Sequence, residues 1–209
     1  MNYFDLVSAL EKNRLFVFSL RDVDNLFPEE KLKTVKNGLS RWTVSGRFRK
    51  IRRNLYEFVK PGTESDIPDL YVANKIYAPS YISLETALSV YDLIPDIAAQ
   101  VTSMTTLTTR RFTNSHGSFI YRSCRKRVFT GYKLMRYEGC KILIADREKA
   151  LADFVYFSIR RVESLNYDEE RFNKMILKKL NWPKVLRYAG LFNEKTVRAL
   201  KNLKSWGKC

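Results

Sequence analysis

Residues 28–59 read PEEKLKTVKNGLSRWTVSGRFRKIRRNLYEFV, and this stretch decides the fold of the N-terminal part of the chain. Pro28–Glu30 suits the first turn of a helix, because proline fits that position and acidic side chains favour the positive end of the helix dipole. Gly46 suits the helix end. The pattern of residues 47–59 predicts a two-stranded hairpin with its turn near Arg53-Asn54. We therefore expect a helix followed by a basic hairpin.

The predicted helix has two different faces. At about 100° per residue, one face is apolar and carries Leu32, Val35, Leu39 and Trp42. The opposite face is polar and partly basic, with side chains of the types that bond base edges and phosphates: Lys33, Thr34, Asn37, Ser40 and Arg41. The hairpin adds five bases, which suit phosphate contacts: Arg47, Arg49, Lys50, Arg52 and Arg53.

The residues before this stretch complete a recognisable order of elements. We predict a helix over Asn2–Lys12, a short strand over Leu15–Phe18 and a second short helix that starts at Ser19 or Arg21-Asp22 and ends near Phe27. Helix, strand, helix, basic helix and basic hairpin is the order of a winged helix-turn-helix, in which the third helix enters the major groove. We therefore predict double-stranded DNA as a partner. The alternative is a small helical domain whose basic hairpin binds nothing.

Composition excludes several classes of protein. The chain has 209 residues, 45% of them hydrophobic and 13% aromatic, which is too many for a disordered basic tail. It contains neither a long apolar run nor a signal-peptide pattern, so we expect a cytoplasmic protein with no membrane partner. The three cysteines show no CxxC spacing and there is one histidine, so we expect no metal site, no disulfide framework and no cofactor.

The net charge of +16 is concentrated in separate segments. Residues 30–60 carry ten basic and two acidic side chains, and residues 110–141 carry nine and one, so each segment has a net charge of +8. Residues 61–109 carry one base and six acids. Single-sign stripes of this kind attract polyanions.

Residues 1–62 are therefore assigned to a winged helix-turn-helix domain and residues 66–209 to a second domain, joined by a polar connector around residues 62–68. In the second domain we predict helices over 69–75 and from Ser83 to near Pro95. Strands are predicted over 101–108, 119–122, 131–137 and 141–144. Further helices follow Asp146 and cover about 168–179, 183–189 and 193–204. The predicted class is α+β, with a mixed sheet covered by helices.

Two phrases in this second domain carry a family resemblance. Residues 78–88 read APSYISLETAL and residues 142–153 read ILIADREKALAD, with a β-rich region between them. Together with the N-terminal winged helix-turn-helix, they resemble the AbiEi family of antitoxins from bacterial type IV toxin-antitoxin and abortive-infection systems. One departure is Asn54, where the family often has glycine in the wing turn; asparagine tolerates positive φ, which leaves the wing intact.

The resemblance implies an autorepressor that binds inverted repeats in the promoter of its own operon. It also implies a C-terminal domain that antagonises a nucleotidyltransferase toxin without forming a stable complex with it. The alternative is a stand-alone winged-helix regulator whose C-terminal domain senses a ligand or dimerises.

The second basic stripe has no assigned role from sequence. Its bases are Arg110, Arg111, Arg122, Arg125, Lys126 and Arg127. They form either a nucleic-acid or partner surface, or a solvated loop and strand edge on which bases discourage edge-to-edge pairing.

We predict no enzymatic activity and no catalytic residues. Glu138 and Lys141 are separated by two residues, whereas the magnesium-dependent nuclease pattern has one between its acid and lysine. Asp146, Glu148, Lys149 and Asp153 are interpreted as capping and dipole compensation at a helix start. Cys124 lies among bases that would lower the pKa of its thiol.

Overall fold

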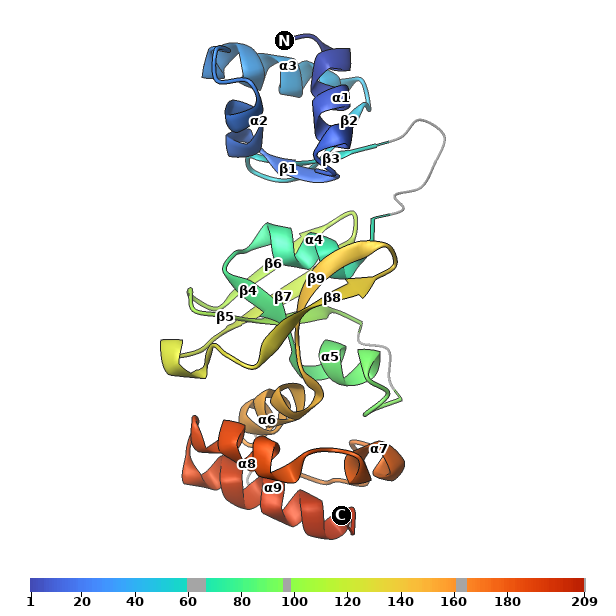
Figure 1. Cartoon of the computed structure of the whole chain (residues 1–209), viewed down its shortest axis with the longest axis vertical. Coiled ribbons are helices and arrows are strands. Elements are labelled where there is room, and N and C mark those ends of the chain that lie inside the picture. The colour runs from blue at the N-terminus through green and yellow to red at the C-terminus, as the bar shows by residue number, and fades with distance from the viewer. Residues whose placement is uncertain (60–66, 96–98, 161–164, 209) are drawn as a thin grey trace. The chain divides into compact units, whose positions relative to one another are not determined.

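The computed structural model of the chain describes residues 1–59, 67–95, 99–160 and 165–208. By its internal packing the chain divides into two compact units (Figure 1). The first comprises Met1–Ile76 with Asn114–His116, and the second comprises Tyr77–Thr113 with Gly117–Cys209. Most of the predicted connector, residues 62–66, lies outside the described residues.

The first unit combines helices with a small sheet. Figure 1 shows α1, α2 and α3 on one side of the three-stranded sheet. In chain order its elements are α1 (Tyr3–Lys12), β1 (Val17–Ser19), α2 (Leu20–Leu26), α3 (Leu32–Val44), β2 (Phe48–Arg52), β3 (Leu55–Phe58) and α4 (Asp69–Ile76). The order of elements up to β3 is the one expected from sequence, and α4 matches the helix predicted over 69–75.

Capping boxes fix the first two helix starts. The side chain of Asn2 accepts from the backbone N–H of Asp5, and the carboxylate of Asp5 accepts from the N–H of Asn2. Ser19 and Asp22 form the same reciprocal pair before α2. These bonds satisfy backbone donors that a helix start leaves unpaired. They confirm Asn2 as a cap and select Ser19 as the start of α2.

Helix α3 begins later than predicted. A turn closed by the N–H of Glu30 on the carbonyl of Phe27 takes up Pro28 and Glu29, so the helical ladder starts on the carbonyl of Lys31. The predicted end is confirmed. Gly46 has φ +73°, which glycine adopts without steric cost, and Arg47 donates to the carbonyl of Trp42 in the bond that closes a Schellman motif.

The sheet of the first unit packs an aromatic cluster against the helices. Its strand order is β1-β3-β2, and both neighbouring pairs are antiparallel. The ring centroid of Phe48 lies 5.2 Å from that of Phe18 on β1 and 6.0 Å from that of Trp42 on α3, and both contacts are edge-to-face, so strand β2 packs against α3 through the Trp42 ring. Arg52 pairs with Leu55, and Arg53-Asn54 forms the turn, with Asn54 at φ +61° as its residue type allows.

The second unit contains a six-stranded mixed sheet, ordered β6-β7-β5-β4-β9-β8. Strand β4 pairs antiparallel with β5 and parallel with β9, while β5 and β7 are parallel. The mixed sheet was predicted, but β4 and β6 were not. The strands are β4 (Ser80–Ile82), β5 (Val101–Thr105), β6 (Arg110–Asn114), β7 (Gly117–Ser123), β8 (Tyr132–Tyr137) and β9 (Cys140–Ala145).

Helices cover this sheet, as predicted. Figure 1 shows α6 between the sheet and the pair α8 and α9, and α6 contacts β9, α5, α8 and α9. The helices are α5 (Leu84–Val90), the short 3-10 turn η1 (Lys126–Val128), α6 (Arg147–Ser158), α7 (Lys174–Lys178), α8 (Trp182–Gly190) and α9 (Glu194–Trp206). The chain is therefore of the α+β class.

Two helix predictions in the second unit are wrong in detail. The helix expected over about 168–179 is reduced to α7, because the side chain of Asn173 accepts from two backbone N–H groups and starts a new helix there. The helix expected from Ser83 to near Pro95 is α5, which already ends at Val90. Ser83 precedes α5 but makes no side-chain capping hydrogen bond, because its hydroxyl donates to Asp153 instead.

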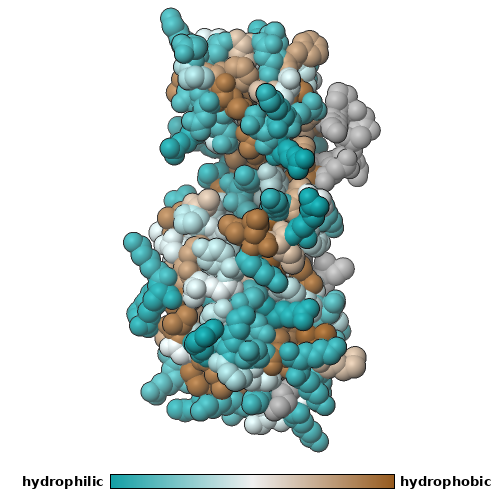
Figure 2. Space-filling model, in the orientation of Figure 1, coloured by the Kyte–Doolittle hydropathy of each residue, from teal (hydrophilic) through white to brown (hydrophobic). Residues whose placement is uncertain are grey.

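No helix among the described residues is both long and apolar enough to cross a membrane. On the face drawn in Figure 2 hydrophilic residues predominate, with hydrophobic patches among them. The large hydrophobic side chains that are most exposed include Phe4, Val44, Leu134 and Met175.

Candidate nucleic-acid interface

The outer face of α3 is the first part of the candidate interface. All five residues predicted for this face are exposed: Lys33, Thr34, Asn37, Ser40 and Arg41. On the opposite side Val35, Leu39 and Trp42 are buried in the core. Leu32, which was expected on that apolar side, is 45% exposed because it is the first residue of the shortened helix. The residues of the polar face therefore do not belong to the buried core of the unit.

Two further residues of α3 extend this face and were not singled out from sequence. Lys36 is exposed and lies about 60° around the helix from Lys33, at the edge of the polar face. Val44 is 88% exposed. It lies about 20° around the helix from Lys33, at the C-terminal end of α3. The helical period of 3.6 residues places both residues on this side of α3. The same period, applied to the sequence, could have identified them. A methyl-bearing side chain here suits contact with a thymine methyl group.

The hairpin supplies the second part. Arg47, Lys50, Arg52 and Arg53 are exposed, and Arg53 is in the turn. The guanidinium of Arg47 lies 4.6 Å from the ring centroid of Tyr3 on α1. Such a contact holds the charged group in place without neutralising it.

Arg49 departs from the prediction for the hairpin. Its side chain is 36% exposed and its guanidinium lies 3.6 Å from the carboxylate of Glu57 on the neighbouring strand. Glu57 is buried, and its carboxylate also accepts a hydrogen bond from one ring nitrogen of His116, while the other ring nitrogen donates to Asp69. Hydrogen bonds to Asp69 and Glu57 raise the pKa of His116 to about 9 against the effect of burial. Arg49 is thus engaged within the unit.

Helix and hairpin form one surface because the core ties them together. The rings of Trp42 on α3 and Phe48 on β2 pack edge to face. The Schellman turn at Gly46 leads directly from one element to the other. The exposed groups of α3 and of the hairpin therefore lie on consecutive elements with a fixed relative position.

The second basic stripe is split by the structure. Arg110 and Arg111 are exposed on β6, which is an edge strand of the sheet, and Arg110 lies 5.9 Å from the ring of Tyr77. Arg122, near the end of β7, lies 6.0 Å from the ring of Phe157. Bases on an edge strand are expected to block pairing with other chains.

The other three bases of the stripe surround η1. Arg125, Lys126 and Arg127 are all exposed. Arg125 and Arg127 line a pocket of about 440 Å³, whereas Lys126 does not.

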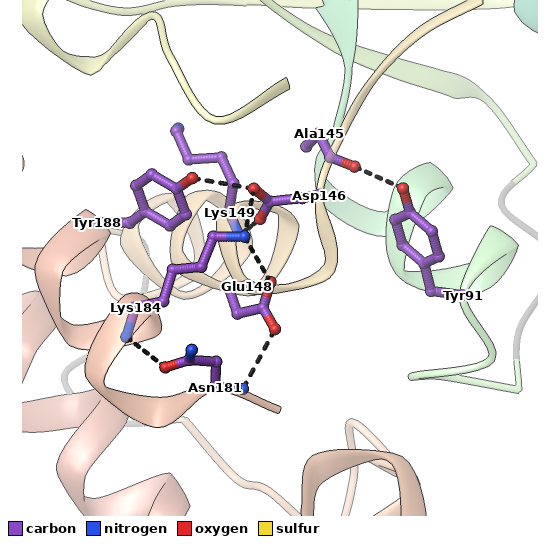
Figure 3. A network of polar contacts seen from close by, with 8 residues as sticks. All are labelled: Tyr91, Ala145, Asp146, Glu148, Lys149, Asn181, Lys184 and Tyr188. Atoms are coloured by element: carbon purple, nitrogen blue, oxygen red, sulfur yellow. Dashed lines mark hydrogen bonds and ion pairs between the residues drawn. The ribbon is translucent and has the colours of Figure 1, made fainter. Parts of the chain in front are cut away.

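The acidic residues at the start of α6 form a network between helices (Figure 3). Asp146 is confirmed as the cap, since its carboxylate accepts from the N–H of Lys149, and it also accepts from the hydroxyl of Tyr188 at 2.9 Å. Lys184 on α8 lies 3.0 Å from Asp146 and 3.2 Å from Glu148. The network joins α6 to α8, so these carboxylates are committed to structural contacts.

The side chains of Lys149 and Asp153 take no part in capping α6. Both are fully buried and form an ion pair one turn apart along α6. Asp153 also accepts hydrogen bonds from the hydroxyls of Tyr81 at 3.1 Å and Ser83 at 2.7 Å. The capping interpretation is therefore wrong for this pair, which links α6 to β4 and to the turn before α5.

The prediction for Cys124 is also wrong. Burial raises the pKa of its thiol to about 11; Asp153 acts in the same direction, and Lys149 opposes it. The neighbouring arginines are exposed to water, so their charges do not offset this burial.

Among the described residues, no group of three His, Cys, Asp or Glu side chains is arranged to hold a metal ion. Glu138 and Gly139, both at positive φ, form the turn between β8 and β9. The chain matches no protein-family model, and a search of curated proteins finds no significant relative.

Proposed function

We propose that the first unit is a winged helix-turn-helix that binds promoter DNA, and that the protein is an autorepressing antitoxin of the type IV class. The observation that carries the DNA-binding part is the exposure of the complete polar face of α3 beside an exposed basic hairpin. A face of this kind, with amide, hydroxyl and guanidinium groups, can bond both base edges and phosphates.

The two elements have different roles in this proposal. The face of α3 enters the major groove, where Asn37 and Arg41 carry the groups suited to adenine and guanine. Arg47, Lys50, Arg52 and Arg53 contact phosphates and set the salt-dependent part of the affinity. Arg49 orients the hairpin through Glu57 and contributes less to binding.

The antitoxin part rests on the resemblance of two phrases, which the fold brings together. Residues 80–82 form β4, residues 142–145 belong to β9, and Ile82 pairs with Ile144 in register. Tyr81 and Ser83 of the first phrase bond to Asp153 of the second. Separated by more than 50 residues, the phrases make one buried polar cluster. The hydrogen bonds of Tyr81 and Ser83 to Asp153 give a physical reason for the two phrases to occur in the same chain. They support treating the two phrases as a single sequence motif.

The DNA-binding proposal is tested with the DNA upstream of the protein's own reading frame. Electrophoretic shift on the full promoter and on half-sites should give retarded complexes that competitor DNA of random sequence does not remove. Arg52→Ala/Arg53→Ala should weaken the shift, while Arg198→Ala/Lys201→Ala, which removes two exposed bases from α9, should not. Equal retardation of promoter and random DNA would contradict autorepression.

The antitoxin proposal needs a separate readout. A neighbouring nucleotidyltransferase gene should be toxic when expressed alone and silent when the full-length protein is co-expressed. The Arg52→Ala/Arg53→Ala variant should still rescue growth if antagonism belongs to the second unit. The absence of a toxic neighbour would instead favour a stand-alone regulator with a ligand-sensing second unit, an alternative that the pocket beside Arg125 and Arg127 favours.

A further inference from the structure

The second unit has a pocket whose lining combines positive charge with aromatic rings. It has a volume of about 440 Å³, within the range of small-molecule sites. Three separate parts of the chain form it: the segment from the end of β7 through η1, Tyr156 in the second half of α6, and the turn between α8 and α9. The site therefore depends on the folded unit and not on a single loop.

The positive side of the pocket consists of Arg125 and Arg127. Both are exposed, and neither forms an ion pair within the described ranges of the chain. Each guanidinium offers a planar set of N–H donors that matches phosphate oxygens. The thiol of Cys124, which also lines the pocket, is protonated at neutral pH because burial raises its pKa to about 11, so it adds no negative charge.

One wall of the pocket is aromatic. Tyr156 and Phe192 stack with centroids 4.2 Å apart and an interplanar angle of 22°. The Nζ of Lys149 lies 5.2 Å from the centroid of the Phe192 ring and pairs with the carboxylate of Asp153. This buried ion pair therefore adds no net charge beside the pocket.

Asn193 and Tyr156 bring polar groups with remaining hydrogen-bonding capacity to this wall of the pocket. Asn193 uses its side-chain oxygen to accept from the N–H and the hydroxyl of Thr196, which leaves its amide nitrogen able to donate. For the hydroxyl of Tyr156, no hydrogen bond is present among the described residues. These groups could bond the polar edge of a heterocycle that lies against the apolar surface.

We propose that this pocket binds a nucleotide, with its phosphate on Arg125 and Arg127 and its base against Tyr156 and Phe192. Phosphate recognition by arginine and base contact with aromatic side chains are the two components by which proteins hold single nucleotides and single-stranded RNA. The site concerns the second unit alone and does not depend on DNA binding by the first.

The test uses isothermal titration calorimetry on the full-length protein with adenosine monophosphate, with a five-residue adenosine RNA and with inorganic phosphate. Adenosine monophosphate should bind at least about tenfold more tightly than phosphate, because only the nucleotide reaches the aromatic wall. The RNA and adenosine monophosphate are compared in the Arg52→Ala/Arg53→Ala background, which reduces binding at the hairpin. Tighter binding of the RNA than of the mononucleotide identifies a strand as the source, and equal binding identifies a free nucleotide.

Variants locate the binding. Arg125→Gln/Arg127→Gln should weaken nucleotide binding by about tenfold or more, and Tyr156→Leu should remove the advantage of nucleotide over phosphate. Arg110→Gln/Arg111→Gln is the matched control, since it removes the same charge from the same stripe outside the pocket. Both arginine pairs are exposed, so folding is unaffected, and Tyr156→Leu is compared by thermal unfolding.

Three results would overturn the proposal: no binding of either nucleotide probe, equal affinity for phosphate and nucleotide, or an equal loss in the two arginine pairs.

Discussion

Asp153 shows how one residue can look functional and act structurally. Its carboxylate accepts hydrogen bonds from the hydroxyls of Tyr81 and Ser83 and forms an ion pair with Lys149. All three partner residues are buried. A charge taken out of water in this way is tolerated only when its partners are complete. The sequence places Lys149 and Asp153 one turn apart on a helix, but the two hydroxyl partners lie about 70 residues earlier in the chain, and no local pattern predicts them.

Removing one partner of this pair should destabilise the second unit strongly. Lys149→Met leaves the carboxylate of Asp153 buried and uncompensated, and we expect a loss of about 3–5 kcal/mol. The double variant Lys149→Met/Asp153→Asn should recover most of that loss, because it removes both charges and keeps a side-chain oxygen that accepts from the hydroxyls of Tyr81 and Ser83. Hydrogen exchange of the α6 amides in the full-length protein measures the change. A double variant as unstable as the single one would contradict the charge argument.

Cys124 should be unreactive toward alkylating agents at neutral pH. A thiol with a pKa of about 11 is almost entirely protonated at pH 7, and only the thiolate attacks. Its rate of reaction with iodoacetamide should therefore rise about tenfold per pH unit between pH 7 and pH 9. Mass spectrometry of the modified peptides gives the rate, and the same measurement in urea is the control. A rate that levels off below pH 9 would show that the neighbouring bases lower this pKa.

Among the helices and strands, the sequence best predicts those whose ends are set by hydrogen bonds between residues close together in the chain. Helices α1 and α2 start at Asn2 and Ser19, where side chains within the same four residues complete the cap. Strand β4 was missed because its three residues gain their conformation from pairing with β5 and β9 on either side. Strand β6 was missed because its arginines do not show the alternation of a half-buried strand.

The turn between β2 and β3 should tolerate only residues that accept positive φ. Asn54 has φ +61°, where a β-branched side chain is strained. Asn54→Val should destabilise the hairpin by about 1–2 kcal/mol and weaken DNA binding, whereas Asn54→Gly should leave both unchanged. Thermal unfolding and electrophoretic shift measure the two effects. Unchanged stability in Asn54→Val would show that the turn rearranges without cost.

Helix α3 should separate sequence preference from general affinity. Asn37→Ala should lower affinity for the promoter by about tenfold with little effect on random DNA, because a base contact is lost. Lys36→Ala, at the edge of the same face, should weaken binding to both DNAs alike, as expected for a phosphate contact. Fluorescence anisotropy on both DNAs measures the ratio. Loss of affinity for both DNAs in Asn37→Ala would remove it from the base-reading set.

In the whole molecule, the two stripes with a net charge of +8 each, residues 30–60 and 110–141, have different surroundings. The first lies on α3 and the hairpin, where the predicted groups are exposed apart from Arg49. The second divides into an edge strand and the rim of a pocket, a division that depends on the packing of α6 and the α8–α9 turn. Charge counts along the chain predict the stripes, but only the tertiary fold determines what each base faces.

We propose that the hairpin binds DNA through phosphate contacts, and the salt dependence of binding reports on these contacts. Affinity for the promoter is measured between 50 and 200 mM salt, and the slope of log K against log salt counts the phosphates contacted. We predict that Arg52→Ala/Arg53→Ala reduces the magnitude of this slope by about 2, while Arg198→Ala/Lys201→Ala leaves it unchanged. An unchanged affinity and slope in Arg52→Ala/Arg53→Ala, or an equal reduction of the slope in both variants, would show that the hairpin does not contact DNA phosphates through these arginines.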